Sequence, residues 1–427
     1  MKTKSIKNLI LISFPIIIFV IGIVLCSVLI PAYAKNWNEN LTLAQTVTPY
    51  WKNENNGEIT VYDEIVMPIR YGSSNEAICY LAYTPKTIVS VKNYSGEITY
   101  SSSQYSVEGN KISFTYNNGM PYVQDEWLDN KNVPSQYQDG IINSTYNDGG
   151  GTNSGMHVIA ENALTRTNHL IVTYTYDSSQ DLGFEVPSFQ PENYPNLLKK
   201  LNNKEPVKIL IFGDSISVGA SASSMMGFAP YLPTWFELIQ SYLAQEYYNG
   251  DTSKVTIINE SEGGQASSYG VEQLYNNTFD KTGFDLIIIG FGMNDASLQL
   301  NENIFKSNIS TILNHLRAFS PNADYILLGS FTANPKSTFF GPHAEYMPLL
   351  ADLATKFNLI GETGSQSGCT FVNMYEISTG ILSNKQANNA YDTRYQYLDI
   401  SANYTNHPND YMIRLYAGAI LSTFIEF

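Results

Sequence analysis

The chain is poor in cysteine, histidine and charged residues. Of its 427 residues, three are cysteine, five are histidine and 15% are charged. Only Cys79 and Cys369 follow residue 34, too few for a disulfide framework, and we expect no bond between them. Basic residues number 24 against 39 acidic ones, a net charge of -15. Because nucleic-acid binding relies on basic residues that neutralise phosphate, nucleic acid is not expected as a partner.

Several motifs that would assign other chemistries are also missing. The sequence has no metal-ligand spacing, no phosphate-binding glycine loop and no dinucleotide fingerprint, so we expect no metal and no cofactor. The paired acids Asp63-Glu64 and Asp125-Glu126 lie in β-rich sequence. Solvated strand edges explain them more simply than a glycosidase pair does.

The first residues carry a targeting pattern. A basic head with Lys2, Lys4 and Lys7 precedes an uncharged apolar stretch over residues 9–30, and Ala32-Tyr-Ala34 has the small-x-small form of a signal-peptidase site. About 20 apolar residues also suffice to span a bilayer, so residues 1–34 are either a signal peptide or a membrane anchor, with residues 9–30 as the tether. Both alternatives predict an extracellular protein, secreted or held at the outer face of the cytoplasmic membrane.

The pattern over residues 45–186 predicts an antiparallel β-sandwich, a jelly-roll-like accessory domain. Short β-branched or aromatic runs alternate with turn residues, as expected for such a fold. The runs are residues 59–62, 87–91, 111–116 and 169–176. Residues 137–155, which include four consecutive residues Asp148-Gly-Gly-Gly151, show no periodicity, and we expect a long exposed loop there.

After a linker at residues 187–205, the pattern from 206 to 427 changes to alternating strands and helices. The predicted strands are residues 207–212, 255–259, 286–290 and 325–329, and the predicted helices are 234–247, 303–319 and 411–424. Uniformly apolar strands are typical of a parallel sheet covered on both faces, so the sequence predicts a doubly wound α/β domain.

Four sequence blocks in this second domain carry the chemical signal. The first predicted strand ends in Gly213-Asp-Ser215, at the edge where open α/β sheets bind ligands. Taken alone, this tripeptide could be an ordinary turn. The next two strands lead to Gly263-Gly264 and to Gly292-Met-Asn294, and His407 stands in Asn406-His-Pro-Asn409 before the last helix.

Together these blocks resemble the SGNH/GDSL hydrolase family over roughly residues 205–427. The resemblance implies a flavodoxin-like doubly wound sheet, with Ser215 as nucleophile and His407 as general base. It also implies that the backbone N–H groups of Ser215 and Gly264 and the side chain of Asn294 form the oxyanion hole. More loosely, the β-rich segment resembles the N-terminal domain of some secreted carbohydrate esterases.

One residue departs from the family pattern. The family usually has Asp three residues before the catalytic histidine, and this chain has Tyr404 there. That carboxylate fixes the imidazole tautomer. Asp399 and Asp410 are the nearest acids in sequence, but neither has the family spacing, so we expect a Ser-His dyad whose histidine is oriented by a backbone carbonyl near Tyr404.

The resemblance favours a bacterial extracellular serine esterase that removes small acyl groups, acetyl above all, from polysaccharide. A second hypothesis is that the protein is a lipid-directed esterase or lysophospholipase, with residues 225–228 as acyl contacts. The missing Asp suggests a third, a non-catalytic glycan-binding protein.

Overall fold

The computed structural model describes residues 41–139, 141–147, 153–160, 163–335, 337–360, 367–386 and 396–427, which belong to one compact unit. The predicted signal peptide or anchor at residues 1–34 lies outside these residues. Within the described ranges, no helix has both the length and the apolar character needed to cross a membrane.

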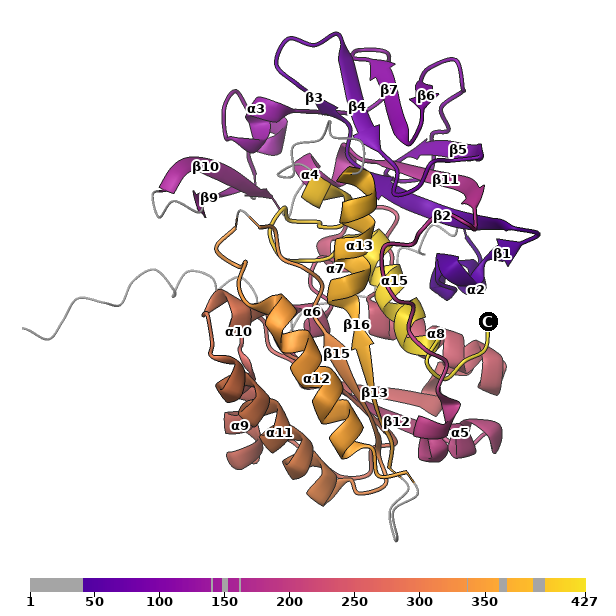
Figure 1. The fold of residues 1–427 in the computed structure, drawn as a ribbon, viewed down its shortest axis with the longest axis vertical. Coiled ribbons are helices and arrows are strands. Elements are labelled where there is room, and N and C mark those ends of the chain that lie inside the picture. Colours follow the sequence, from indigo (N-terminus) through magenta and orange to yellow (C-terminus); the bar gives the residue numbers. More distant parts are fainter. Residues whose placement is uncertain are drawn as a thin grey trace, which may run out of the picture. The chain divides into compact units, whose positions relative to one another are not determined.

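A parallel sheet organises the C-terminal half, as predicted (Figure 1). Its order is β13-β12-β14-β15-β16, and every neighbouring pair is parallel. The strands are β12 Val207–Gly213, β13 Val255–Asn259, β14 Leu286–Gly290, β15 Asp324–Gly329 and β16 Cys369–Asn373. The sequence did not predict β16.

Helices cover both faces of this sheet. They are α5 Pro195–Asn202, α6 Ser215–Val218, α7 Ser223–Met226, α8 Trp235–Tyr248, α9 Ser267–Tyr275, α10 Met293–Ser297, α11 Glu302–Phe319, α12 His343–Phe357, α13 Met374–Gln386 and α15 Asp410–Leu421. The three predicted helices correspond to α8, α11 and α15. Helix α8 begins where predicted because Thr234 and Glu237 form a capping box that satisfies free N–H groups of the first turn.

Alternate residues of β12 face two different apolar clusters. Ile209 and Ile211 belong to the cluster that includes residues of α5, α8 and α15. Leu210 and Phe212 belong to the cluster with residues of α9, α11 and α12. Successive side chains of a strand point to opposite faces, so this alternation confirms that the sheet is buried on both sides.

The N-terminal part contains two sheets, with strand orders β1-β2-β11-β5 and β6-β7-β4-β3-β8. Their pairs are antiparallel except β3 with β8. The strands are β1 Glu54–Asn55, β2 Glu58–Val66, β3 Ile69–Arg70, β4 Glu76–Tyr80, β5 Thr87–Asn93, β6 Ser106–Glu108, β7 Lys111–Thr115, β8 Val123–Gln124 and β11 Leu170–Asp177. Val61 of β2, Val172 of β11 and Phe114 of β7 share one core cluster. The antiparallel sheets are confirmed, and the jelly-roll topology stays a prediction.

The long loop predicted at residues 137–155 is wrong in part. Strands β9 Ile141–Asn147 and β10 Asn153–Ala160 pair as an antiparallel ribbon. Residues 141–147 include two isoleucines, a threonine and a tyrosine, which favour a strand. The neighbouring glycine run led us to predict a loop for the whole segment.

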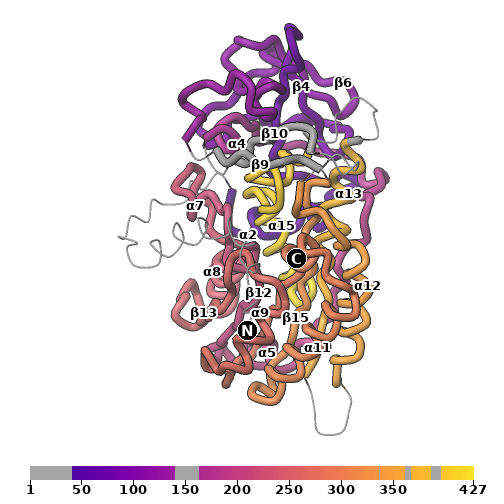
Figure 2. The backbone as a smooth tube through the Cα atoms, turned by 90° about the vertical axis from the view of Figure 1, so that its left-hand side faces the viewer, coloured from indigo at the N-terminus to yellow at the C-terminus, as the bar shows by residue number. Residues whose placement is uncertain are grey.

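Three short helices complete the N-terminal part: α2 Leu43–Val47, α3 Asp125–Leu128 and α4 Ala163–Thr167. Helix α15 packs against α2 and β2 as well as α8, so the last helix of the chain contacts both parts (Figure 2). In the predicted linker, α5 packs on β12 and β15, and Leu197 and Leu201 are fully buried. The predicted domain boundaries at 45–186, 187–205 and 206–427 stay a prediction.

Candidate active site

The strand order brings three of the four sequence blocks to one place. Strand β12 lies between β13 and β14, and all three run in the same direction. Ser215, Gly264 and Asn294 follow the carboxyl ends of these three neighbouring strands. A doubly wound sheet opens a crevice at this point because the chain leaves the first strand in both directions.

Ser215 is the first residue of α6, immediately after β12. Asp214 is the N-cap, and its carboxylate accepts a hydrogen bond from the Ile216 N–H at 3.0 Å. The turn is tight against β14, because a Cβ on Gly213 would lie 2.3 Å from the Gly290 carbonyl oxygen. Glycine is therefore required before Asp214, and the turn fixes Ser215 at the sheet edge, where it is 8% exposed.

His407 contacts the nucleophile candidate directly. Its Nε2 lies 2.9 Å from Ser215 Oγ, although the two residues are 192 positions apart in sequence. The segment that carries His407 is shaped by Asn403, whose Oδ1 accepts hydrogen bonds from the N–H groups of Thr405, Asn406 and His407 at 3.0–3.1 Å. The structure thus brings together the serine and the histidine that the sequence singled out.

The Gly263-Gly264 loop lies against Ser215, and Asn294 contacts the residue that follows this loop. A Cβ on Gly263 would be 3.8 Å from the Cβ of Ser215, so this loop passes directly over the serine. Gly264 has φ +77°, a conformation that favours glycine, and open space lies where its side chain would be. Asn294 Nδ2 donates to the Gln265 carbonyl at 3.0 Å, which fixes the amide next to Gly264 and leaves it a second N–H.

Two buried carboxylates tie the three loops to one another. Asp214 also accepts from the Met293 N–H at 3.3 Å, which links the nucleophile turn to the Asn294 turn. Asp295 accepts from the Ser267 N–H at 3.0 Å, which links the Asn294 turn to the start of α9. Burial raises the pKa of Asp214 to about 7, and the backbone N–H donors oppose that rise.

The groups that the sequence offered as orienting partners of His407 make contacts of their own. Asp410 accepts from the Ser223 N–H at 2.9 Å, and the carbonyls of Tyr404 and Thr405 accept from Asn334 Nδ2 and N, both at 2.8 Å. The hydroxyl of Ser221 lies 3.2 Å from His407 Nδ1, and the orientation of His407 by a backbone carbonyl near Tyr404 stays a prediction. The sequence held no signal for Ser221, which lies in a run of small residues.

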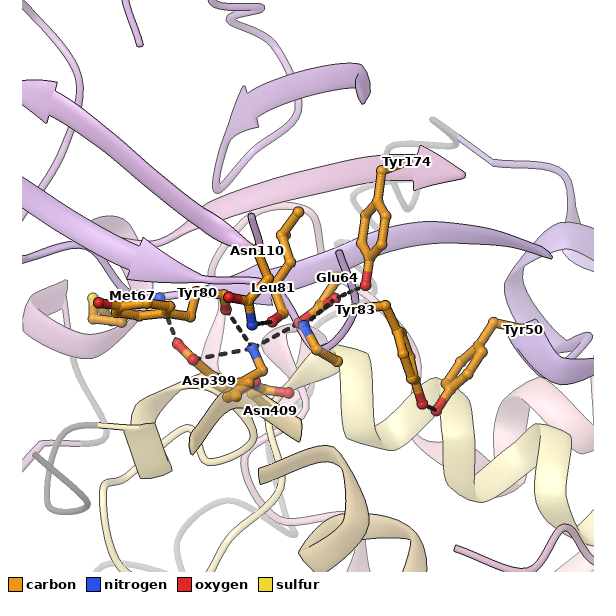
Figure 3. A network of polar contacts seen from close by, with 12 residues as sticks. Tyr50, Glu64, Met67, Tyr80, Leu81, Tyr83, Asn110, Tyr174, Asp399 and Asn409 are labelled. Carbon is orange, nitrogen blue, oxygen red and sulfur yellow. Dashed lines mark hydrogen bonds and ion pairs between the residues drawn. The ribbon is translucent and has the colours of Figure 1, made fainter. Parts of the chain in front are cut away.

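Asp399 belongs to a buried ion cluster with Lys385 and Glu64 (Figure 3). Lys385 of α13 lies 2.6 Å from Glu64 Oε1 and 3.0 Å from Asp399 Oδ2, and it donates to the Tyr80 carbonyl at 3.0 Å. Burial lowers the pKa of Lys385, but the two carboxylates together have a larger effect in the opposite direction. The pKa of Lys385 is therefore raised above its ordinary value. Burial raises the pKa of Asp399, and the Lys385 charge and the Met67 N–H oppose that rise.

Hydrogen bonds from the N-terminal part complete this cluster. Glu64 accepts from Tyr174 Oη at 2.6 Å and from the Ala82 N–H at 3.0 Å. Asp399 accepts from the Met67 N–H at 2.6 Å. These donors explain how two carboxylates and one ammonium group can share a site without solvent. They also account for Glu64, which is fully buried and not the solvated strand-edge acid expected from sequence.

Tyr404 stands where the family usually has Asp, and its side chain packs among apolar side chains. It is 2% exposed, has φ +69° and belongs to a cluster with Met67, Ile69, Val123 and Leu128 of the N-terminal part. A carboxylate at this position would be buried among apolar side chains, which is costly. The residue that replaces the family Asp therefore serves the packing of the β-rich part against the His407 segment.

His343 is the first residue of α12, its Nε2 lies 3.4 Å from Met293 Sδ, and burial lowers its pKa to about 4. Cys79 and Cys369 are free and buried. Across the described part of the chain, no group of three or more His, Cys, Asp or Glu side chains could hold a metal ion.

The Asn294 amide offers a direct test of the oxyanion hole. We expect Asn294→Ala to lower kcat by about 10²–10³-fold with little change in KM, because the lost N–H acts on the charge that develops in the transition state. Asn276→Ala, at an exposed position after α9, is the matched control. Equal kcat values for Asn294→Ala and the control would exclude Asn294 as an oxyanion donor.

A serine hydrogen-bonded to a histidine at the carboxyl edge of a parallel sheet is the arrangement of a serine hydrolase. Residues 211–413 match the profile of the GDSL-like Lipase/Acylhydrolase family. This region of the chain therefore belongs to that family, and the protein is a serine ester hydrolase of the SGNH type.

Solved structures with similar folds include several esterases. The acetylxylan esterase Axe2 from Geobacillus stearothermophilus is 14% identical, with 52% of this chain and 96% of that chain covered and a TM-score of 0.37. LAE5, an α/β hydrolase from the metagenome of Lake Arreo, Spain, is 17% identical, with 52% and 95% covered and a TM-score of 0.35. A carbohydrate esterase of family 3 from Talaromyces cellulolyticus is 16% identical, with 50% and 96% covered and a TM-score of 0.34. No curated protein matches the chain.

Proposed function

We propose that this enzyme removes small acyl groups, acetyl above all, from carbohydrate outside the cytoplasm, through an acyl-enzyme on Ser215. The observation that carries the proposal is the 2.9 Å contact between Ser215 Oγ and His407 Nε2. No step of the proposed reaction requires a metal ion or a cofactor.

In the first step, Ser215 Oγ attacks the ester carbonyl carbon while its proton passes to His407 Nε2. The carbonyl oxygen becomes negatively charged and accepts hydrogen bonds from the N–H groups of Ser215 and Gly264 and from Asn294. The C–O bond to the sugar then breaks, and the sugar oxygen takes the proton from Nε2. Water repeats the sequence on the acyl-serine, with His407 as base, and releases the free acid and Ser215.

Support for a carbohydrate substrate comes from the sequence. The GDSL-like domain follows a β-rich segment and a leader pattern, an arrangement that resembles secreted carbohydrate esterases. The chain also has 31 tyrosines and a low content of charged residues, which suits a surface that contacts neutral polar ligands. The leader pattern over residues 1–34 supports an extracellular setting, with either a cleaved signal peptide or a tether through residues 9–30.

A lipid substrate is the second candidate, and one residue favours it. Met225 of α7 is 55% exposed, so it could contact an acyl chain. Phe228, another large residue of the suggested acyl contact, has the guanidinium of Arg166 5.9 Å from its ring centroid. The non-catalytic glycan-binding reading is set aside because the chain is an ester hydrolase.

Acyl-chain preference separates the two enzyme readings. We expect the protein to cleave 4-nitrophenyl acetate with a kcat/KM at least about tenfold above that for the octanoate, because differential transition-state binding sets this ratio. Initial rates on the acetyl, butanoyl and octanoyl esters measure it, with acetylated xylan as the polymeric substrate. A preference for octanoate together with no release of acetate from xylan would favour the lipid reading.

A further inference from the structure

The hydroxyl of Ser221 lies on the far side of the His407 ring from the nucleophile. Ser221 Oγ is 3.2 Å from Nδ1, while Ser215 Oγ is 2.9 Å from Nε2. For His407 to act as a base toward Ser215, Nε2 must be unprotonated. In the neutral ring the proton then sits on Nδ1, so Nδ1–H donates to Ser221 Oγ.

We propose that Ser221 is a positioning residue for the catalytic base, and that Arg166 of the β-rich part holds it in place. The proposal rests on the proposed function only in taking His407 as the base. Ser221 does not touch the reacting atoms. By accepting from Nδ1–H, it stabilises the tautomer in which Nε2 can accept the Ser215 proton, which is part of the task that a triad carboxylate performs.

The backbone at Ser221 is held in a conformation that serine rarely adopts. Its φ is +67°, and the side chain is 1% exposed. A non-glycine residue in this left-handed region has a free-energy cost, so surrounding contacts must maintain it. Without that conformation, the hydroxyl would not meet the imidazole.

Two contacts from other elements supply this restraint. Arg166 of α4 donates from Nη2 to the Ser221 carbonyl at 2.6 Å, and Arg166 is 6% exposed. Asp410, at the start of α15, accepts from the Ser223 N–H at 2.9 Å. Burial raises the pKa of Asp410, and the nearby Arg166 charge and the bond to Ser223 oppose that rise. Ser221 is thus held from the β-rich part and from the helix that follows His407.

The arrangement makes the N-terminal part a structural component of the active site. Helix α4 precedes β11, within the segment that the sequence assigned to an accessory domain. A buried arginine from that segment fixes the residue that meets His407. The β-rich part therefore contributes to the geometry of the base as well as to any contact with substrate.

The test compares Ser221→Gly and Ser221→Ala in the full-length protein. Both remove the hydroxyl, but glycine adopts φ +67° without strain whereas alanine does not. We expect both to lower kcat on 4-nitrophenyl acetate by about tenfold or more, with KM and the thermal midpoint of Ser221→Gly close to wild type. Ser224→Gly, on the next helix, is the matched control.

The ¹⁵N chemical shifts of labelled histidine give a second readout that does not depend on turnover. The wild-type His407 signals should show the Nδ1-protonated tautomer, and Ser221→Gly should shift them toward a mixture. His407→Gln identifies the signals among the five histidines. A wild-type kcat and an unchanged His407 tautomer in Ser221→Gly would overturn the proposal, as would a loss of kcat in Ser221→Ala alone, which would trace the effect to backbone strain.

These experiments also distinguish failure of the proposed function from failure of the Ser221 proposal. If the wild-type protein hydrolysed none of the esters, the proposed function would fall. The tautomer of His407 in wild type and in Ser221→Gly would still decide whether Ser221 positions the ring.

Discussion

Ser215→Ala is expected to abolish ester hydrolysis while leaving the fold unchanged. The serine Oγ is the group that bonds to the acyl carbon, and loss of a serine nucleophile lowers kcat by about 10⁶-fold in a comparable hydrolase. The recorded side-chain contact of Ser215 is with His407, so its removal should not disturb packing. Rates on 4-nitrophenyl acetate and thermal unfolding of the same preparation measure both effects.

Ser224→Ala is the control for this experiment, because it removes a hydroxyl from the neighbouring helix α7. It should retain wild-type rates. Turnover by Ser215→Ala at more than about one part in a thousand of the wild-type rate would show that another residue is the nucleophile.

Lys385→Met is expected to produce the largest loss of stability. The ammonium group is fully buried between Glu64 and Asp399, which are fully buried themselves. Removing it leaves two carboxylates without their cation, and breaking such a buried pair typically costs about 3–5 kcal/mol. Urea unfolding followed by fluorescence gives the free energy of unfolding from the midpoint and slope.

The exposed pair Lys86–Glu58 provides a matched control. Lys86→Met removes the same kind of group from the surface, where water and salt screen the interaction, and the urea midpoint should barely move. Equal midpoints for the two variants would mean that the buried cluster does not stabilise the contact between the N-terminal part and the segment before His407. A loss confined to Lys385→Met supports that role.

Local patterns in the sequence predicted the parallel sheet well. Strand β12 is apolar on both faces, a pattern typical of a parallel sheet that is buried on both sides. The capping box of Thr234 and Glu237 marks the start of α8. Two elements were missed. Strand β16 is short, with too few residues to show a period, and the ribbon β9–β10 flanks a glycine run whose turn signal outweighed the β-branched residues beside it.

The candidate site, too, could be predicted only in part from the sequence. Ser215, Gly264, Asn294 and His407 lie in blocks whose order along the chain is itself informative. The strand order explains why the first three follow neighbouring strands, and His407 contacts Ser215 directly. Ser221 could not be predicted, because its contact depends on a positive φ and on an arginine 55 positions earlier. The roles of these residues stay predictions that the variants test.

The acyl-enzyme is the most direct test of the central claim. The protein is mixed with 4-nitrophenyl acetate, quenched in acid during turnover, digested and analysed by mass spectrometry. We predict an acetyl group on the side chain of Ser215 that is absent from Ser215→Ala and accumulates when deacylation is slower than acylation. Rapid hydrolysis by wild type with the acetyl group on another residue, and none on Ser215, would contradict the account.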